Sequence, residues 1–254
     1  MSENGNIIEL VDIHKAFGSQ QVLKGLSLGI PKGETTVIIG RSGGGKSVML
    51  KHMIGLIKPD QGQVLVGGSD IARMNDHQLN RVRRHFGMLF QEAALFDSMN
   101  VMDNVAFPLR EHTKLSEKQI SEKVSEKLAL VGLPGVEHKM PGELSGGMRK
   151  RVGLARAIAL EPDIVLYDEP TTGLDPPLSA AINRLIAYTQ EKLGITSVII
   201  SHDIEGAYAV GQNIAMLYHG QIIAQGTPEQ IRDSSDEVVQ QFIHGRPEGP
   251  IEVI

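Results

Sequence analysis

The fold of this chain is decided by the stretch Gly40-Arg41-Ser42-Gly43-Gly44-Gly45-Lys46-Ser47. A glycine, four variable positions and then Gly-Lys-Ser form the pattern of a phosphate-binding loop. The loop follows the apolar run 36–39, as a strand–loop–helix unit requires. Consecutive backbone N–H groups at a helix N-terminus aim many donors at one anion. We therefore expect all residues of this loop to bind the phosphates of a nucleoside triphosphate.

Two residues of the loop and two acids downstream have individual expected roles. Lys46 should reach the β- and γ-phosphates, and the Ser47 hydroxyl should bind Mg²⁺. The apolar run 164–167 ends in Asp168 and Glu169. Asp168 is the expected metal ligand, and Glu169 is expected to orient and deprotonate the attacking water. Acidic pairs at strand ends are also common as solvated caps, but the phosphate loop upstream favours the catalytic interpretation.

His202 directly follows another apolar run, 197–201. Its imidazole is placed to contact the γ-phosphate and the catalytic carboxylate. A lone histidine at a strand end is more often structural, so this prediction depends on the other motifs. With them, the expected catalytic set is Lys46, Glu169 and His202.

Composition limits the function classes. The chain has 254 residues, of which 41% are apolar and 22% charged, as expected for one compact domain. The net charge of -5 argues against a general nucleic-acid binder, and the absence of cysteine excludes disulfides and thiolate metal sites. We expect no secretory signal in residues 1–18 and no segment near the roughly 20 apolar residues that span a bilayer. If the chain serves a membrane process, other subunits must cross.

Apolar runs and turn residues predict the order of elements. Helices are expected at 46–57, ending at Gly55 or shortly after, and at 76–84, 115–133 and 149–160. The 115–133 helix should bury a stripe of apolar side chains. Strands are expected at 7–13, 21–30, 35–39, 63–66, 163–168, 197–201 and 214–218. Their alternation with helices is typical of a parallel α/β sheet. The stretch from Gly245 is rich in proline and glycine and should not be helical.

A second motif narrows the family. Leu144-Ser145-Gly146-Gly147-Met148 resembles the signature of ABC (ATP-binding cassette) ATPases, and the resemblance extends from about residue 7 to 242. It implies a P-loop NTPase of the ABC ATPase type, with a RecA-like parallel sheet core, an antiparallel β subdomain and a helical subdomain at roughly 92–160. The expected ATPase domain is 1–244, and 245–254 form a C-terminal tail. Met148 departs from the glutamine that commonly ends the signature.

The same resemblance assigns further residues. Phe17 resembles the aromatic that stacks on adenine. Gln91 resembles the glutamine that joins the magnesium shell and senses the nucleotide. Ser145, Gly146 and Gly147 resemble the groups that bind ATP held by the opposite protomer, and Asp175 belongs to the loop that links the two active sites. The implied cofactors are ATP and Mg²⁺, and the implied first partner is a second copy of the chain.

Three stretches, 40–52, 89–97 and 104–112, resemble ATPase subunits of MCE-type lipid transporters, as in the Mla (maintenance of lipid asymmetry) systems of Gram-negative bacteria. The resemblance implies a peripheral protein at the cytoplasmic face of the inner membrane. The implied partners are a transmembrane permease, an MCE-domain substrate-binding protein, a STAS-domain regulator and transported phospholipid. Residues 94–107 are the expected permease-docking surface, and the tail is expected to extend toward the neighbouring ATPase or regulator.

Two other functions compete with this interpretation. The same ATPase could energise transport of another solute, such as an amino acid or a lipoprotein. A soluble ABC protein acting on ribosomes or DNA usually has paired cassettes or a long coiled-coil insertion. This chain has one cassette and no basic excess, so we expect no nucleic-acid partner.

Overall fold

The computed structural model describes residues 5–252, which form two compact units. The first unit contains residues 5–75 and 200–252, and the second contains 76–199. Residues 1–4 of the expected ATPase domain and 253–254 of the expected tail lie outside the described residues.

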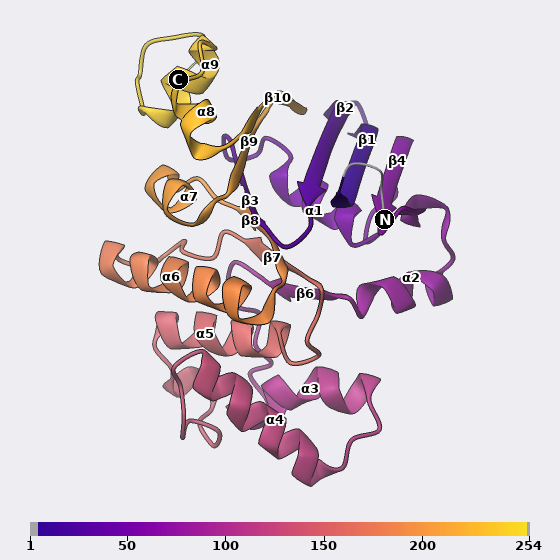
Figure 1. The fold of residues 1–254 in the computed structure, drawn as a ribbon, viewed down its shortest axis with the longest axis vertical. Helices are drawn as coiled ribbons and strands as arrows, with labels where there is room; N and C mark the ends of the chain where they lie inside the picture. The colour runs from indigo at the N-terminus through magenta and orange to yellow at the C-terminus, as the bar shows by residue number, and fades with distance from the viewer. Residues whose placement is uncertain (1–4, 253–254) are drawn as a thin grey trace. The chain divides into compact units, whose positions relative to one another are not determined.

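An antiparallel sheet forms much of the first unit, with strand order β2-β1-β4-β5 (Figure 1). Ile8 of β1 pairs with Ile30 of β2 on one side and with Val66 of β4 on the other. Leu26, Leu28 and Ile30 alternate along β2 and are buried, which is the pattern of a sheet with one face in the core. The sheet confirms the expected antiparallel β subdomain. Its strands are β1 (Asn6–Phe17), β2 (Gln20–Pro31), β4 (Gln61–Val66) and β5 (Ser69–Asp70).

The phosphate-loop strand belongs to the same unit. All residues of β3 (Thr35–Ile39) are buried, as expected for a strand inside a parallel sheet. β3 pairs in parallel with β9 (Asn213–Tyr218), and β10 (Gln221–Gly226) pairs with β9 in antiparallel orientation. The helices of this unit are α1 (Lys46–Met53), the 3-10 turn η1 (Ile71–Arg73), α7 (Ile204–Val210), α8 (Pro228–Arg232) and α9 (Glu237–Ile243).

The second unit combines three strands with most of the long helices. β6 (Phe86–Leu89) pairs in parallel with β7 (Ile164–Asp168), and β8 (Thr196–Ile200), whose last residue belongs to the first unit, lies next to β7. α5 contacts α3, α4, α6 and β6, so it is the central helix of this unit (Figure 1). The helices are α2 (Asp76–Arg83), α3 (Val101–His112), α4 (Glu117–Leu130), the 3-10 turn η2 (Pro141–Glu143), α5 (Gly146–Ala157) and α6 (Pro176–Leu193).

Several helix boundaries differ from the sequence expectations, and three of the differences follow from local capping. α1 ends at Met53 instead of 57, since Gly55 takes a left-handed φ of 66° and the chain turns back. α4 begins at Glu117 because Ser116 and Gln119 form a capping box. The helix expected at 149–160 is α5 and begins earlier, at Gly146, where Ser145 is the N-cap.

The sequence analysis assigned no helix to 101–112, where the structure has α3. Pro108 lies inside this helix and weakens its sequence signal. Asn100 caps its first turn. Asn104 is fully buried, and its amide bonds the backbone of Phe96, Met99 and Asn100. α3 therefore determines the shape of the loop before it.

No helix among residues 5–252 combines the length and the apolar character needed to cross a membrane.

A substitution at Gly87 tests how tightly β6 packs against the end of α5. A Cβ at this position would clash with the backbone carbonyl of Ala157. Gly87→Ala should therefore lower the free energy of unfolding by about 1–3 kcal/mol, the usual cost of overpacking. The measurement is urea denaturation, with Gly142→Ala as the control because a Cβ there meets nothing within 4 Å. Equal stability of the two variants would contradict this packing.

Candidate functional site

The backbone of the phosphate loop depends on its glycines. Gly43 has a φ of 74° and Gly45 a φ of 100°, which are left-handed values that residues with a Cβ rarely adopt. A Cβ at Gly40 would clash with the carbonyl oxygen of Leu217 in β9. The loop therefore runs close to the neighbouring strand and delivers the chain to the N-terminus of α1.

Lys46 is the first residue of α1 and is only 6% exposed. Its Nζ donates to the carbonyl of Gly40 at 2.7 Å and to that of Arg41 at 3.0 Å. The ammonium group is thus held over the loop it belongs to. A cation and a helix N-terminus at one loop suit a polyphosphate, so the residues present fit ATP.

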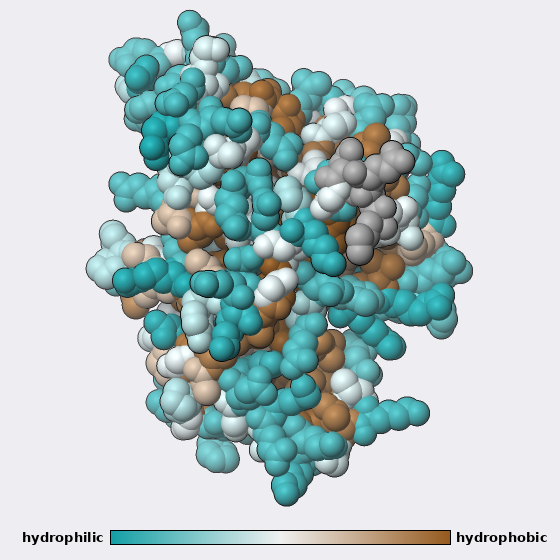
Figure 2. All heavy atoms as spheres, viewed as in Figure 1, coloured by the Kyte–Doolittle hydropathy of each residue, from teal (hydrophilic) through white to brown (hydrophobic). Residues whose placement is uncertain are grey.

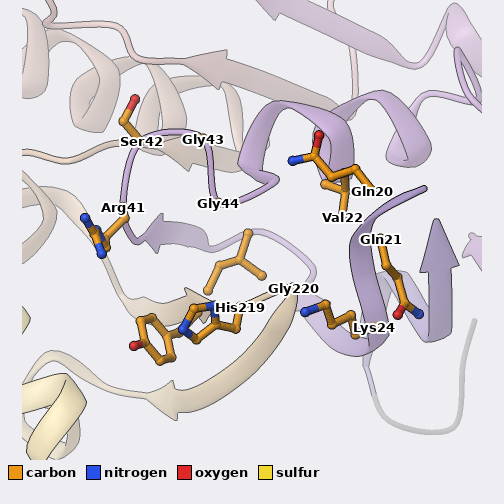
Figure 3. Close-up of a pocket in the computed structure, with 12 residues that line it drawn as sticks. Gln20, Gln21, Val22, Lys24, Arg41, Ser42, Gly43, Gly44, His219 and Gly220 are labelled. Carbon is orange, nitrogen blue, oxygen red and sulfur yellow. The ribbon is translucent and has the colours of Figure 1, made fainter. Parts of the chain in front are cut away.

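Two cavities border the loop within the first unit. One, of about 230 Å³, is lined by Ser42, Gly43 and Gly44 on one side and by Lys24 and His219 on the other (Figure 3). The other, of about 610 Å³, is lined by loop residues 40–42, by His202 and Ile204, by Phe242 and Ile243 of α9, and by Gly245. The loop is therefore accessible from both cavities.

His202 lines a cavity that loop residues 40–42 also line. The Ser201 N–H donates to the Ile38 carbonyl of β3 at 3.2 Å, and the Asp203 N–H donates to Ser201 Oγ at 3.0 Å. Asp203 then caps α7 through a bond to Gly206 N. These bonds fix the backbone on both sides of His202, which lines a cavity shared with Gly40 and Arg41.

Phe17 ends β1 and remains 48% exposed. Lys15 Nζ lies 5.6 Å from the centroid of its ring, and the same ammonium pairs with Asp60 at 2.7 Å. An exposed aromatic face at a strand end is available for stacking, and the adenine-binding role of Phe17 stays a prediction.

The second unit holds the expected acids. Asp168 ends β7, and Glu169 follows with a left-handed φ of 50°. Glu169 Oε2 accepts a hydrogen bond from Thr172 Oγ1 at 3.2 Å. Left-handed backbone is strained for a residue with a Cβ, and such strain is concentrated at functional sites. Among residues 5–252, no cluster of three or more His, Asp or Glu side chains forms a metal site. Carboxylate and hydroxyl oxygens, as in Asp168 and Ser47, are nevertheless the ligand type that Mg²⁺ prefers.

The signature residues form a helix N-terminus in the same unit. Ser145 Oγ accepts from Met148 N at 3.3 Å, and Gly146 begins α5. Gly147 is buried beside Leu178 of α6. Asp175 caps α6 through a 2.9 Å bond from Leu178 N, so the side chain has a structural use in the single chain.

The structure groups the expected residues by unit. The first unit holds Phe17, the whole phosphate loop with Lys46 and Ser47, and His202. The second holds Gln91, Ser145, Gly146, Gly147, Asp168, Glu169 and Asp175. Gln91 is exposed and directly follows the strand β6 and Phe90. The roles of these residues remain predictions.

A match to the family described as ABC transporter covers residues 23–172. The chain belongs to the ABC transporter family. It is therefore an ATPase with the P-loop ABC fold, as its sequence predicted.

Curated relatives of this ABC ATPase are similar over nearly its whole length. It is 44% identical to the protein named intermembrane phospholipid transport system ATP-binding protein MlaF of Haemophilus influenzae, a match that covers 98% of this chain and 94% of that protein. It is 48% identical to the protein named probable ribonucleotide transport ATP-binding protein mkl of Mycobacterium tuberculosis, covering 97% of this chain and 69% of that protein.

Solved structures of ABC cassettes share the fold. The dimeric cassette MJ0796 bound to ADP and phosphate matches with a TM-score of 0.80 and 31% identity, covering 87% of this chain and 98% of that one. The cbiO1 protein of Clostridium perfringens, part of an ABC transporter complex, matches with a TM-score of 0.84 and 30% identity over 96% of each chain.

Three residues that the sequence analysis missed hold the site of this ABC ATPase in place. Lys150 and Arg156 of α5 donate to backbone carbonyls of the loop after β6, and Thr172 binds the Glu169 carboxylate. Lys150 is 5% exposed. It shares a helix face with the buried residues Leu154 and Ala157. A lysine on this apolar face is the sequence feature that could have identified it.

The expected permease-docking segment exposes aromatic side chains. Phe96 is 41% exposed and Phe107 is 37% exposed, with their ring centroids 5.0 Å apart. Figure 2 shows a mainly hydrophilic face with hydrophobic residues emerging in the region where α3 lies in Figure 1. Paired exposed aromatics suit a protein interface.

The C-terminal stretch packs on its own chain over residues 246–252. The side-chain amide of Gln241 in α9 accepts from Ile251 N at 2.6 Å and donates to Ile251 O at 3.0 Å. Ile251 is buried, and Arg41 donates to the Glu252 carbonyl at 2.9 Å. The tail has no helix in residues 245–252, as expected, and in the single chain it reaches the phosphate loop.

His52 is a buried histidine of α1. Its side chain is 1% exposed, Nδ1 donates to Val48 O at 2.7 Å, and Nε2 has no hydrogen-bond partner among residues 5–252. Burial lowers the pKa of His52 below its usual 6.5. The unfolded chain therefore takes up the proton first, and the stability contributed by neutral His52 is lost as pH falls below about 6.5.

We expect the free energy of unfolding to decline on acidification from pH 7.5 to 5.5, with this residue contributing at most about 1.4 kcal/mol per pH unit. His52→Gln should reduce that decline in urea denaturation. His77→Gln, an exposed histidine of α2, should leave it unchanged. Identical pH dependence of the His52 variant and the wild type would refute the assignment.

Proposed function

We propose that this chain is the ATP-hydrolysing subunit of an ABC transporter that moves phospholipid between the inner and outer membranes and so maintains outer-membrane lipid asymmetry. The observation that carries the proposal is the 44% identity to a phospholipid-transport ATPase over 98% of this chain and 94% of that protein. The ribonucleotide cargo named for the mkl relative is the second candidate, and its match covers 69% of that relative.

The proposed chemistry assigns each residue one task. Phe17 stacks on adenine, residues 40–47 bind the phosphates, and Lys46 reaches the β- and γ-phosphates. Glu169 takes the proton of the attacking water, and His202 contacts the γ-phosphate. Mg²⁺, held by Ser47, Gln91 and Asp168, would neutralise charge on the phosphates.

The proposed assembly contains two copies of the chain. Ser145, Gly146 and Gly147 of one copy bind ATP held by the other, and Asp175 links the two sites. The dimeric state of the MJ0796 cassette supports this arrangement. A permease docks on residues 94–107 at the cytoplasmic face of the inner membrane, together with an MCE-domain protein and a STAS-domain regulator. Residues 1–244 form the ATPase domain, with a helical subdomain at roughly 92–160, and 245–254 form the tail.

Removal of the proposed base should stop hydrolysis without stopping binding. Glu169→Gln should lower ATP turnover by roughly 10²- to 10⁴-fold, because general-base assistance is lost, while ATP affinity is kept and a closed dimer accumulates. Turnover and nucleotide affinity are measured on the purified protein. Glu191→Gln, at the exposed end of α6, is the matched control and should hydrolyse normally. Near-normal hydrolysis by the Glu169 variant would remove this residue from the catalytic role.

The cargo is tested by purifying the tagged chain from native membranes in mild detergent. Mass spectrometry should find a permease, an MCE-domain protein and bound phospholipid. Recovery of a different permease with bound nucleotide would instead favour ribonucleotide transport. Recovery of ribosomal or DNA-associated proteins alone would refute a transport role.

A further inference from the structure

Lys150 is a buried cation that the proposed chemistry does not use. Its Nζ donates to the backbone carbonyl of Gln91 and, at 3.5 Å, to the backbone carbonyl of Glu169. One side chain of the signature helix therefore contacts both the loop after β6 and the residue that follows β7. All three residues belong to the second unit.

Burying an ammonium group costs free energy unless the group is paired or hydrogen-bonded. Burial lowers the pKa of Lys150, against the attraction of Glu92, Glu169 and Asp168. Lys127 of α4 offers a contrast within the same unit. It is 1% exposed and forms ion pairs with the carboxylates of Glu126 and Glu161, both at 3.0 Å. Lys127 is thus neutralised by two exposed carboxylates, whereas Lys150 donates to two backbone carbonyls.

The loop after β6 depends on α5 at more than one point. Ala93 and Ala94 have left-handed φ values of 60° and 46°, which are unfavourable for alanine. Arg156 of α5 donates to both of their carbonyls at 2.8 Å, and its guanidinium lies 5.7 Å from the Phe96 ring centroid. Donors from one helix therefore hold this loop in a conformation that it would not adopt alone.

Glu169 is held in a comparable way. Its backbone is left-handed, its carboxylate accepts from Thr172, and its carbonyl accepts from Lys150. Lys150 therefore contacts the backbone carbonyl of Glu169 as well as that of Gln91. The position of Glu169 is thus tied to the position of Gln91 through one side chain.

We propose that Lys150 is a positioning residue that couples the loop at residues 91–96 to Glu169, so that a shift of this loop is transmitted to the catalytic carboxylate. The inference rests on the proposed function, in which Glu169 is the base and residues 94–107 meet the permease. When the permease moves, it displaces this loop and so changes the contact between Lys150 and Gln91. The orientation of the Glu169 carboxylate then changes as well. Such coupling between sites typically amounts to 5- to 150-fold.

The test uses the complete transporter complex in lipid nanodiscs and the ATPase chain alone. Lys150→Met keeps the length of the side chain and removes its donors, Lys150→Gln retains a shorter donor, and Lys150→Arg retains the cation. Lys127→Met is the matched control, another buried lysine of the same unit. The readouts are kcat, the Kd for ATP, and the ratio of turnover with and without the permease.

For Lys150→Met we expect kcat to fall roughly tenfold or more, the ATP Kd to stay within about twofold, and the stimulation by the permease to disappear. Lys150→Arg should recover much of the stimulation and Lys150→Gln little of it. Lys127→Met should keep kcat and stimulation even if its melting temperature falls. If Lys150→Met does not fold, the difference in permease stimulation between Lys150→Arg and Lys150→Gln tests the inference.

Wild-type turnover and stimulation in both Lys150→Met and Lys150→Gln would overturn the inference, as would an equal loss in Lys127→Met. Glu169→Gln separates this result from the proposed function. An inactive Glu169→Gln beside a normal Lys150→Met leaves Glu169 as the base and removes only the coupling role. Normal hydrolysis by Glu169→Gln overturns the base assignment itself, and the inference with it.

Discussion

The arrangement of the first unit depends on a close approach between two backbones. At Gly40 the chain passes so near the Leu217 carbonyl that only glycine fits. At this approach the chain leaves β3 and turns through the phosphate loop into α1, which begins at Lys46. Lys46 closes the loop by binding two of its carbonyls, and Ile38, at the base of the loop, anchors the backbone beside His202.

Cations bound to backbone carbonyls recur in both units. Lys46 and Lys150 are buried and Arg156 is half-buried, and each donates to the carbonyls of a loop that carries site residues. A charged donor forms a stronger hydrogen bond than a neutral one. More free energy is therefore lost if the carbonyl moves away and leaves a charged donor unpaired. These charged donors therefore help to hold the loops that contain left-handed alanine or glutamate. The strain is placed beside the residues expected to respond to nucleotide.

The fold itself leaves the cargo open, because the same cassette serves many transporters. Information on the cargo comes from the relatives named above, and the expected docking segment exposes aromatic side chains. Phe96 and Phe107 form an exposed aromatic pair next to a loop shaped by Asn104. The pair belongs to the segment 94–107, the expected permease-docking surface.

The sequence by itself determined the elements whose signal is local. The phosphate loop and its strand, the antiparallel subdomain, the acids after β7 and the histidine after β8 were all predictable, because glycine spacing and apolar runs act over a few residues. α3 was not, since Pro108 interrupts its pattern and tertiary packing of Asn104 stabilises it. The start of α5 was placed too late because the capping role of Ser145 was not considered.

Only the tertiary structure decided which donors reach which carbonyls. Lys150 and Gln91 are 59 residues apart in sequence, and Arg156 and Ala93 are 63 apart. No local pattern specifies such pairs, because their meeting depends on how α5 packs against β6 and on which residues the packing buries. The contacts of the buried cations and the left-handed φ of Glu169 are therefore properties of the folded chain. The sequence alone named Gln91 and Glu169 as site residues but did not show which side chains hold them.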